Sequence, residues 1–159
     1  MKIYTQIIEA QTLEGQLVND VKAETISLNF DERKRGRFKI ITDSGMAAGI
    51  QIERGHVLRD GSVLSDLEGN QLIIAAAAEK VSTAYEAETR LFARACYHLG
   101  NRHVPLQVGE GFLRYQQDYV LDDMLRGLGL DVMHESASFE PENGAYAPAS
   151  GKAHQHAHN

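Results

Sequence analysis

The chain has 159 residues, of which 43% are apolar and 24% charged, and its formal net charge is -6 at pH 7. This composition is typical of a soluble globular protein with one compact domain or two small ones. The acidic balance argues against a nucleic-acid partner, and no apolar run reaches the roughly 18 residues of a membrane span, so no membrane association is expected.

Residues 1–75 are expected to form a small all-β domain. Polar and apolar side chains alternate over residues 23–30, which is the period of a half-buried strand. Turn residues at 59–61 and 68–70 separate further apolar runs, and this turn spacing is typical of a small sandwich or open barrel. The basic run at residues 33–37 is expected to be a solvated loop between strands. No helix is expected in this part of the chain.

Residues 76–147 show a change to mixed periodicity. A strand is expected over residues 79–84, and an apolar stripe of helical period follows within residues 85–99. Gly100 and Asn101 are expected to end this helix, because both residue types tolerate the left-handed conformation of a C-terminal cap.

The elements after the first helix complete a recognisable order. Strands are expected over residues 104–108, 112–115 and 130–133, and Asp118 is a suitable N-cap for a second helix. Gly127 or Gly129 is expected to end that helix. The resulting β-α-β-β-α-β order is the ferredoxin-like pattern, so the sequence predicts an α+β protein with a ferredoxin-like second domain.

The last segment, residues 148–159, is expected to be a mobile tail, because it lacks the apolar residues needed to offset the entropy of ordering. It carries His154, His156 and His158 in alternate positions. Neutral imidazole binds nickel, copper and zinc, and a flexible backbone can bring two or three alternate rings around one ion. The other interpretations are an incidental polar tail or the remnant of an expression tag.

The other histidines are less informative by themselves. His98 falls in the last turn of the first predicted helix, and His103 lies between that helix and the next strand, where its side chain can project outward. Taken alone, each is better explained as structural than as a ligand. His56 and His134 have no partner in the sequence, and we expect them to be structural or surface residues.

Enzymatic activity is not expected, since no set of nucleophile, base and orienting group can be assembled. A metallohydrolase would need three fixed ligands and a general base, and the sequence offers neither. Cys96 is the only cysteine, which excludes an intrachain disulfide. The N-terminal residues do not resemble a secretory leader, so we expect a cytoplasmic protein.

Four segments together resemble the urease accessory protein E family. The first is the unusual sequence YHLGNRHVPLQ at residues 97–107. The others are GHVLRDG at 55–61, DYVLDDML at 118–125 and FEPENGAY at 139–146. They occur in the order expected of that family.

The resemblance implies an N-terminal β domain similar to chaperone peptide-binding modules and a homodimer joined through the ferredoxin-like domains. It also implies that His103 binds metal next to its symmetry mate, because a two-fold axis makes one ligand into two. Some family members carry further histidines after an arginine-tyrosine pair. In this chain Arg114 and Tyr115 are followed by residues 116–119 (QQDY), so such secondary sites are not expected.

The function implied is delivery of Ni(II) to apo-urease, together with other urease accessory proteins that include a GTPase. Zn(II) and Cu(II) are also expected to bind, since imidazole accepts both. Ligation needs neutral imidazole, so affinity should fall below about pH 6.5. Two alternatives stay open: a scaffold that binds urease or peptides through its β domain, and a nickel buffer in which delivery is secondary.

Overall fold

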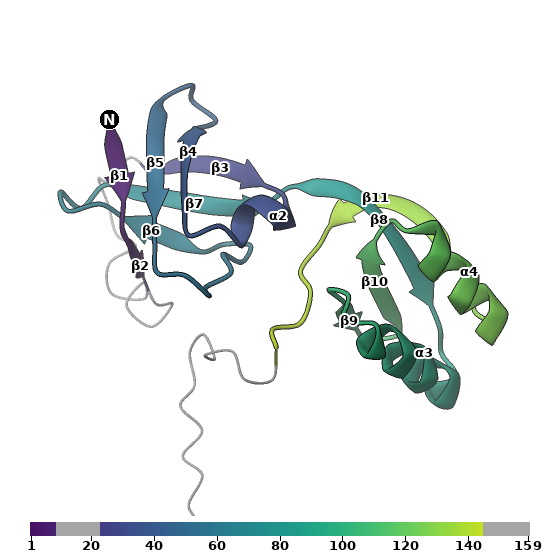
Figure 1. Ribbon diagram of the computed structural model, residues 1–159. Coiled ribbons are helices and arrows are strands. Elements are labelled where there is room, and N and C mark those ends of the chain that lie inside the picture. The colour runs from purple at the N-terminus through teal and green to yellow at the C-terminus, as the bar shows by residue number, and fades with distance from the viewer. Residues whose placement is uncertain (9–22, 145–159) are drawn as a thin grey trace, which may run out of the picture. The chain divides into compact units, whose positions relative to one another are not determined.

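The computed structural model describes residues 1–8 and 23–144 (Figure 1), and the chain divides into two compact units. Among the described residues, the first unit contains 1–8, 23–27 and 31–75, and the second contains 28–30 and 76–143. Both sheets and helices are present, which confirms the predicted α+β class. None of the helices in the described ranges is long and apolar enough to cross a membrane.

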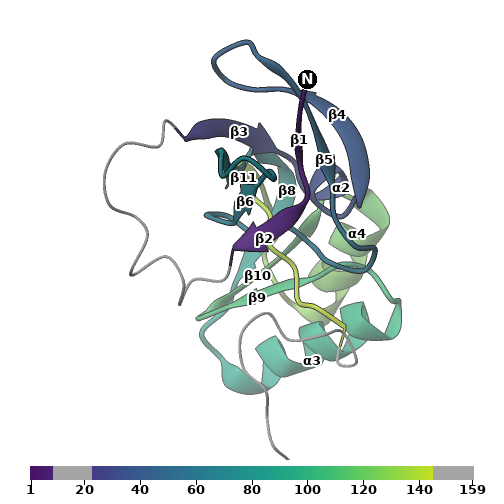
Figure 2. The same cartoon turned by 90° about the vertical axis from the view of Figure 1, so that its left-hand side faces the viewer.

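The first unit is built on two sheets. In the first sheet the order is β1 (Lys2–Tyr4), β5 (Ala47–Gln51) and β4 (Arg37–Ile41), with β1 parallel and β4 antiparallel to the central β5. Figure 2 shows these three strands next to one another. In the second sheet the order is β2 (Gln6–Ile8), β6 (Val63–Ser65), β7 (Gln71–Ala76) and β3 (Glu24–Leu28).

The strand pattern predicted near residues 23–30 is present in β3. Ile26 and Leu28 are buried, whereas Thr25 and Ser27 are exposed, as the period of two requires. The core of the unit consists of side chains that are almost completely buried: Tyr4, Ala48, Ile50, Leu58, Leu64, Leu72 and Ile74.

The basic run at residues 33–37 was predicted to be a solvated loop, and no helix was expected in this part of the chain. The structure differs on both points. A short helix, α2, spans Phe30–Arg33, and Arg33 is completely buried. Its Nη1 donates a hydrogen bond to the carbonyl oxygen of Leu58 at 3.1 Å, and its own carbonyl oxygen accepts from the Leu58 N–H at 2.9 Å. The prediction was wrong for Arg33 because a charge is tolerated in the interior when backbone oxygens satisfy it, and that partner lies far away in the sequence.

The second unit contains one four-stranded sheet and two helices. Along the chain the elements are β8 (Ala78–Tyr85), α3 (Thr89–Asn101), β9 (Gln107–Gly109), β10 (Phe112–Gln116), α4 (Tyr119–Leu128) and β11 (Met133–Ser138). The sheet order is β11-β8-β10-β9, and each neighbouring pair is antiparallel. The helices pack on the sheet face that carries Ala84, Leu113 and Tyr115, and a single apolar cluster joins them.

Capping interactions determine where the two helices of this unit begin and where α4 ends. Glu88 accepts hydrogen bonds from the N–H groups of Arg90 and Leu91, so α3 begins after it, four residues later than predicted. Asp118 caps α4 as predicted, by accepting from Val120 and Leu121. Gly129, with φ of 105°, ends α4 in the left-handed conformation.

Candidate functional site

His103 lies at the exit of α3, in an uncommon backbone conformation. Gly100 and Asn101 were predicted to end this helix, but α3 continues through Asn101. The residue that turns left-handed is His103, whose φ is 57°, and no other non-glycine residue has a positive φ in the described ranges. Its N–H donates to the carbonyl oxygen of Gly100 at 3.0 Å, and its side chain is exposed. The helix end therefore presents the imidazole to solvent from a defined backbone position.

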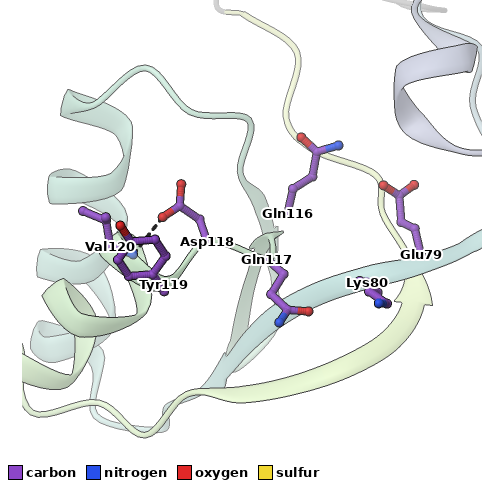
Figure 3. A pocket seen from close by; sticks show the side chains of 7 residues that line it. All are labelled: Glu79, Lys80, Gln116, Gln117, Asp118, Tyr119 and Val120. Carbon is purple, nitrogen blue, oxygen red and sulfur yellow. Dashed lines mark hydrogen bonds between the residues drawn. The ribbon is translucent and has the colours of Figure 1, made fainter.

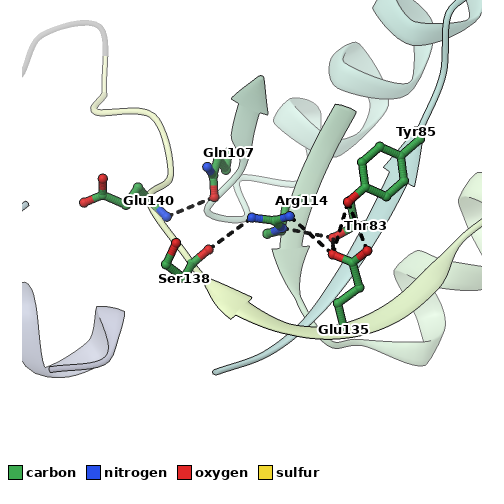
Figure 4. A network of polar contacts seen from close by, with 7 residues as sticks. All are labelled: Thr83, Tyr85, Gln107, Arg114, Glu135, Ser138 and Glu140. Carbon is green, nitrogen blue, oxygen red and sulfur yellow. Dashed lines mark hydrogen bonds and ion pairs between the residues drawn. The ribbon is translucent and has the colours of Figure 1, made fainter. Parts of the chain in front are cut away.

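The chain that follows β11 returns to the segment just after His103. The backbone N–H of Glu142 donates to the carbonyl oxygen of Leu106 at 2.8 Å. The N–H of Glu140 donates to Oε1 of Gln107 at 3.0 Å, as Figure 4 shows. We call residues 139–142 the strap. Its two hydrogen bonds join it to Leu106 and Gln107, which lie three and four residues after His103.

Arg114 contacts the last residue of β11, just before the strap (Figure 4). Its Nη1 donates to the carbonyl oxygen of Ser138 at 3.2 Å, and its Nε donates to Oγ1 of Thr83 at 3.0 Å. Its Nη2 forms an ion pair with Glu135 at 3.3 Å, and the same carboxylate accepts from the Tyr85 hydroxyl at 3.0 Å. Because these contacts join β10 to β8 and β11, Arg114 has a structural role here.

The predicted metal ligands of the tail, His154, His156 and His158, lie outside the described residues. Within residues 1–8 and 23–144 no group of three histidine, cysteine or carboxylate side chains could hold a metal ion. A complete site would therefore need ligands besides those of the described part of one chain.

His98 and His56 have local surroundings. His98 is in the last turn of α3, as predicted, and its ring meets that of Tyr97 edge-on at a centroid distance of 5.3 Å. His56 Nε2 lies 3.8 Å from a carboxylate oxygen of Glu53, which is itself exposed. Neither position brings the imidazole next to a further ligand in the described chain.

His134 belongs to a network that sequence reasoning missed. Its Nε2 lies 2.7 Å from Oδ2 of Asp122, and Oδ1 of the same carboxylate accepts from the Tyr115 hydroxyl at 2.7 Å. An ionised carboxylate only accepts, so Nε2 is the donor and Nδ1 is free to accept from Gln117 at 3.2 Å. Asp122 is only 1% exposed. The predicted helix placed Asp122 beside Asp123 but gave no sign that it faces a strand.

Ionisation in this network follows from burial and hydrogen bonding. Burial opposes the charge on Asp122, but hydrogen bonds from His134 and Tyr115 outweigh it and lower the pKa of that carboxyl below its usual value. Burial, together with the Asp122 carboxylate, raises the pKa of the Tyr115 phenol. The phenol therefore stays protonated and remains a donor. The network joins α4, β10 and β11.

A hollow of about 650 Å³ lies where β8, β10 and α4 meet (Figure 3). Its lining includes Gln116, Gln117 and Tyr119, the positions at which the family resemblance allows further histidines. Amide and phenol groups are weak ligands for a nickel-like ion. Asp118, also at this hollow, is occupied in capping α4.

Comparison with known proteins identifies the class of protein that this two-unit α+β fold represents. Residues 4–77 match the N-terminal domain of the UreE urease accessory protein, and residues 79–159 match its C-terminal domain. The chain belongs to the urease accessory protein UreE family.

Relatives with that name align over most of the chain. A protein of Pseudomonas putida strain F1 is 56% identical over 130 residues, which cover 81% of this chain and 78% of the relative. One of Proteus mirabilis is 46% identical over 146 residues, covering 92% and 91%. One of Vibrio parahaemolyticus is 43% identical over 157 residues, covering 98% of both chains. The family name supports a role in urease maturation.

Proposed function

We propose that this protein is a cytoplasmic, non-enzymatic nickel carrier that delivers Ni(II) to apo-urease in company with other urease accessory proteins, including a GTPase. In this proposal two copies of the chain form a homodimer through ferredoxin-like second units. The His103 side chains of the two copies provide a shared first site, and His154, His156 and His158 complete or supply it. Zn(II) and Cu(II) compete for the same imidazoles.

The observation that carries the proposal is the conformation of His103. A left-handed backbone costs a residue with a side chain about 1 kcal/mol relative to glycine. Glycine is the usual residue at this point of a helix end. An exposed histidine that keeps this conformation at that cost supports a functional role for its imidazole, because strained positions gather at functional sites.

The strap supplies a second argument. Glu142 is fixed to Leu106, and residues 103–106 span at most about 11 Å when extended. The chain from Glu142 to His154 can span up to about 40 Å. This length is enough for a tail imidazole to reach His103 of the same chain. A short tether gives the tail imidazoles a high effective concentration near His103. This favours a shared metal site even without rigidly fixed ligands.

The surroundings of His103 also suit an interface. Tyr97, in α3 six residues before His103, is 68% exposed, and Val108, in the edge strand β9 five residues after it, is also exposed. Exposed aromatic and aliphatic side chains close to the ligand in the sequence fit the apolar centre of a dimer contact. A two-fold axis there would bring the His103 side chains of the two copies together, so that a pair of ligands forms although one chain supplies only one.

Calorimetric titration of nickel into tag-free, metal-stripped protein tests the proposal. We expect one tight site per dimer in the wild type and its loss in His103→Ala. His98→Ala, a histidine five residues earlier in the same segment, is the matched control and should retain the site. Deletion of residues 150–159 should lower capacity while leaving His103-dependent binding.

Two results would contradict this mechanism. Undiminished binding of the first equivalent in His103→Ala would exclude a shared His103 site. Binding that survives that substitution but disappears with residues 150–159 would reduce the protein to a tail-based nickel buffer. Sedimentation of the metal-free protein gives the dimer a separate test, since a monomer at micromolar concentration has no two-fold site.

A further inference from the structure

An asparagine followed by a glycine occurs once in the chain, at Asn143 and Gly144. The pair comes directly after the strap. Both residues are exposed, and neither lies in a helix or a strand. The side-chain carbonyl carbon of an asparagine, Cγ, is open to attack by the backbone nitrogen of the next residue, because the two atoms then close a five-membered ring. This pair has the sequence and the exposure that the ring closure needs.

The backbone nitrogen of Gly144 is accessible for this attack. Glycine has no Cβ and adopts conformations that other residues avoid, so its nitrogen can turn toward the preceding side chain. A Cβ built on Gly144 would meet no atom within 4 Å, which shows that the space beside the backbone is open. Within the part of the chain that the structure describes, the Gly144 N–H donates no hydrogen bond. No acceptor there competes for the nucleophile.

The chain is anchored only up to the residue before this pair. The N–H of Glu142 donates to the carbonyl oxygen of Leu106 at 2.8 Å, and Phe139, at the other end of the strap, is completely buried. The two reacting atoms lie beyond this anchor and belong to adjacent residues. Their approach therefore depends on local rotation alone and not on how distant parts of the chain are placed.

The asparagines inside the helices and at their ends are protected by the fold. The N–H that follows Asn29 donates to Oε2 of Glu79 at 2.8 Å. The N–H that follows Asn101 donates to the carbonyl oxygen of Leu99 at 3.1 Å. A backbone nitrogen that is held by an acceptor cannot turn toward the preceding side chain, so these positions should react slowly in the folded protein.

Two turn positions are protected in the same way. An aspartate followed by glycine can close the same ring, but the N–H of Gly61, which follows Asp60, donates to the carbonyl oxygen of Ile74 at 2.8 Å. Asn70 has its side chain fixed, because its Nδ2 donates to Oδ2 of Asp66 at 2.7 Å. Sequence alone marks Asp60 and Asn143 as reactive, and the hydrogen bonds of the fold distinguish them.

We propose that Asn143 is a site of spontaneous deamidation in the folded protein. The Gly144 nitrogen gives up its proton and forms a bond to Cγ of Asn143. The bond from Cγ to Nδ2 breaks, and the amide nitrogen leaves with that proton as ammonia. Water then opens the resulting succinimide at either of its two carbonyl carbons, which gives aspartate or isoaspartate. The only co-reactant is water, and no electron is transferred.

The reaction changes the chain between the strap and residues 145–159. It adds one negative charge to a chain of net charge -6, next to the exposed Glu142. In the isoaspartate product the main chain runs through the former side-chain carbon, so one CH₂ group is inserted after the strap. The hydrogen bond from Glu142 to Leu106 precedes the altered peptide unit and is expected to persist. This inference does not rest on nickel binding by His103.

Ageing of the tag-free, metal-free full-length protein tests the proposal. After incubation at neutral and at alkaline pH, peptide mapping by mass spectrometry follows the change from amide to carboxyl at each asparagine. Methylation by a protein isoaspartate methyltransferase detects the second product. We expect conversion at Asn143 ahead of every other asparagine, and faster at alkaline pH, because the attacking nitrogen must lose its proton. Gly144→Ala should slow the reaction at least about tenfold, since the added Cβ restricts the backbone.

Asn101→Gln is the matched control, since it removes an exposed asparagine whose following N–H is held, and it should leave the rate at Asn143 unchanged. Unfolding in urea should change that rate little but should accelerate reaction at Asn101 in the wild type. The proposal is overturned if Asn143 stays intact in the folded protein, or reacts much faster in urea, because the fold would then protect it. It is also overturned if Gly144→Ala reacts as fast as the wild type, or if Asn101 reacts equally fast in the folded chain.

Discussion

Nε2 of His134 and Oδ2 of Asp122 lie 2.7 Å apart and join β11 to α4 across 12 residues of sequence. The carboxylate is buried and also accepts from Tyr115, so its removal would leave two donors without their acceptor. Unpaired buried donors are costly, which makes Asp122 a strong determinant of the stability of the second unit.

Asp122→Asn should lower the free energy of unfolding at pH 7 by about 2–3 kcal/mol, since it removes a buried acceptor with charged character. The control is Asp123→Asn in the adjacent position, whose side chain is 75% exposed. That change should stay within about 0.5 kcal/mol. Urea unfolding of both variants measures the difference. Equal effects at the two positions would show that the buried pair does not stabilise the unit.

The Asp122 carboxyl should make the free energy of unfolding depend on pH in the acidic range. Its pKa is lowered in the folded protein, so its contribution is present above the unfolded value of about 3.9 and is lost as the pH falls through the folded value. The wild-type unfolding free energy should therefore decline below about pH 4, and Asp122→Asn should lack this component. Urea titrations between pH 3 and pH 7 test this. Parallel pH profiles for the two proteins would contradict it.

His103→Gly should stabilise the metal-free protein by about 1 kcal/mol, because glycine adopts a positive φ without strain. His103→Ala should give no such gain, since alanine keeps the Cβ that opposes the left-handed conformation. Both variants should lose the proposed nickel site. Thermal unfolding without metal measures the first effect. A glycine variant no more stable than the alanine variant would remove the argument from strain.

Arg33→Ala should destabilise the first unit by about 2–3 kcal/mol, because it deprives the buried Leu58 carbonyl of a charged donor and leaves a void. Lys34 is the neighbouring control: it is half-exposed and forms an ion pair with Asp31 at 2.6 Å. Lys34→Ala should change stability by no more than about 0.5 kcal/mol. Chemical denaturation followed by tyrosine fluorescence compares the two. Similar small effects would contradict the structural role of Arg33.

The two glycines near the end of α4 should respond in opposite directions. Gly129→Ala should cost about 1 kcal/mol, since φ at this position is 105°. Gly127 is inside the helix, and a Cβ there meets nothing within 4 Å, so Gly127→Ala should stabilise by up to about 1 kcal/mol. Thermal midpoints of the two variants give the sign directly. A stabilised Gly129→Ala would show that this helix end is not held left-handed.

Local pattern was sufficient for much of the fold. The mixed class, the cap at Asp118 and the alternation in β3 depend on neighbours within a few residues, and all three were predicted correctly. The choice between Gly127 and Gly129 stayed open because both residues tolerate the cap conformation. The β11 strand was expected too early, since strand pairing with β8, and not local composition, determines that it begins at Met133.

The sequence by itself determined the α+β class, the positions of most strands and helices, and the resemblance that points to His103 and the tail. These features follow from side-chain period and capping preference, which act between near neighbours. Only the tertiary structure decided that His103 is the left-handed residue, that Arg33 is buried against Leu58, and that Asp122 meets His134. It also decided that the strap returns to Leu106. Each of these depends on which distant segments come together to exclude water and satisfy buried polar groups, and no local pattern encodes that choice.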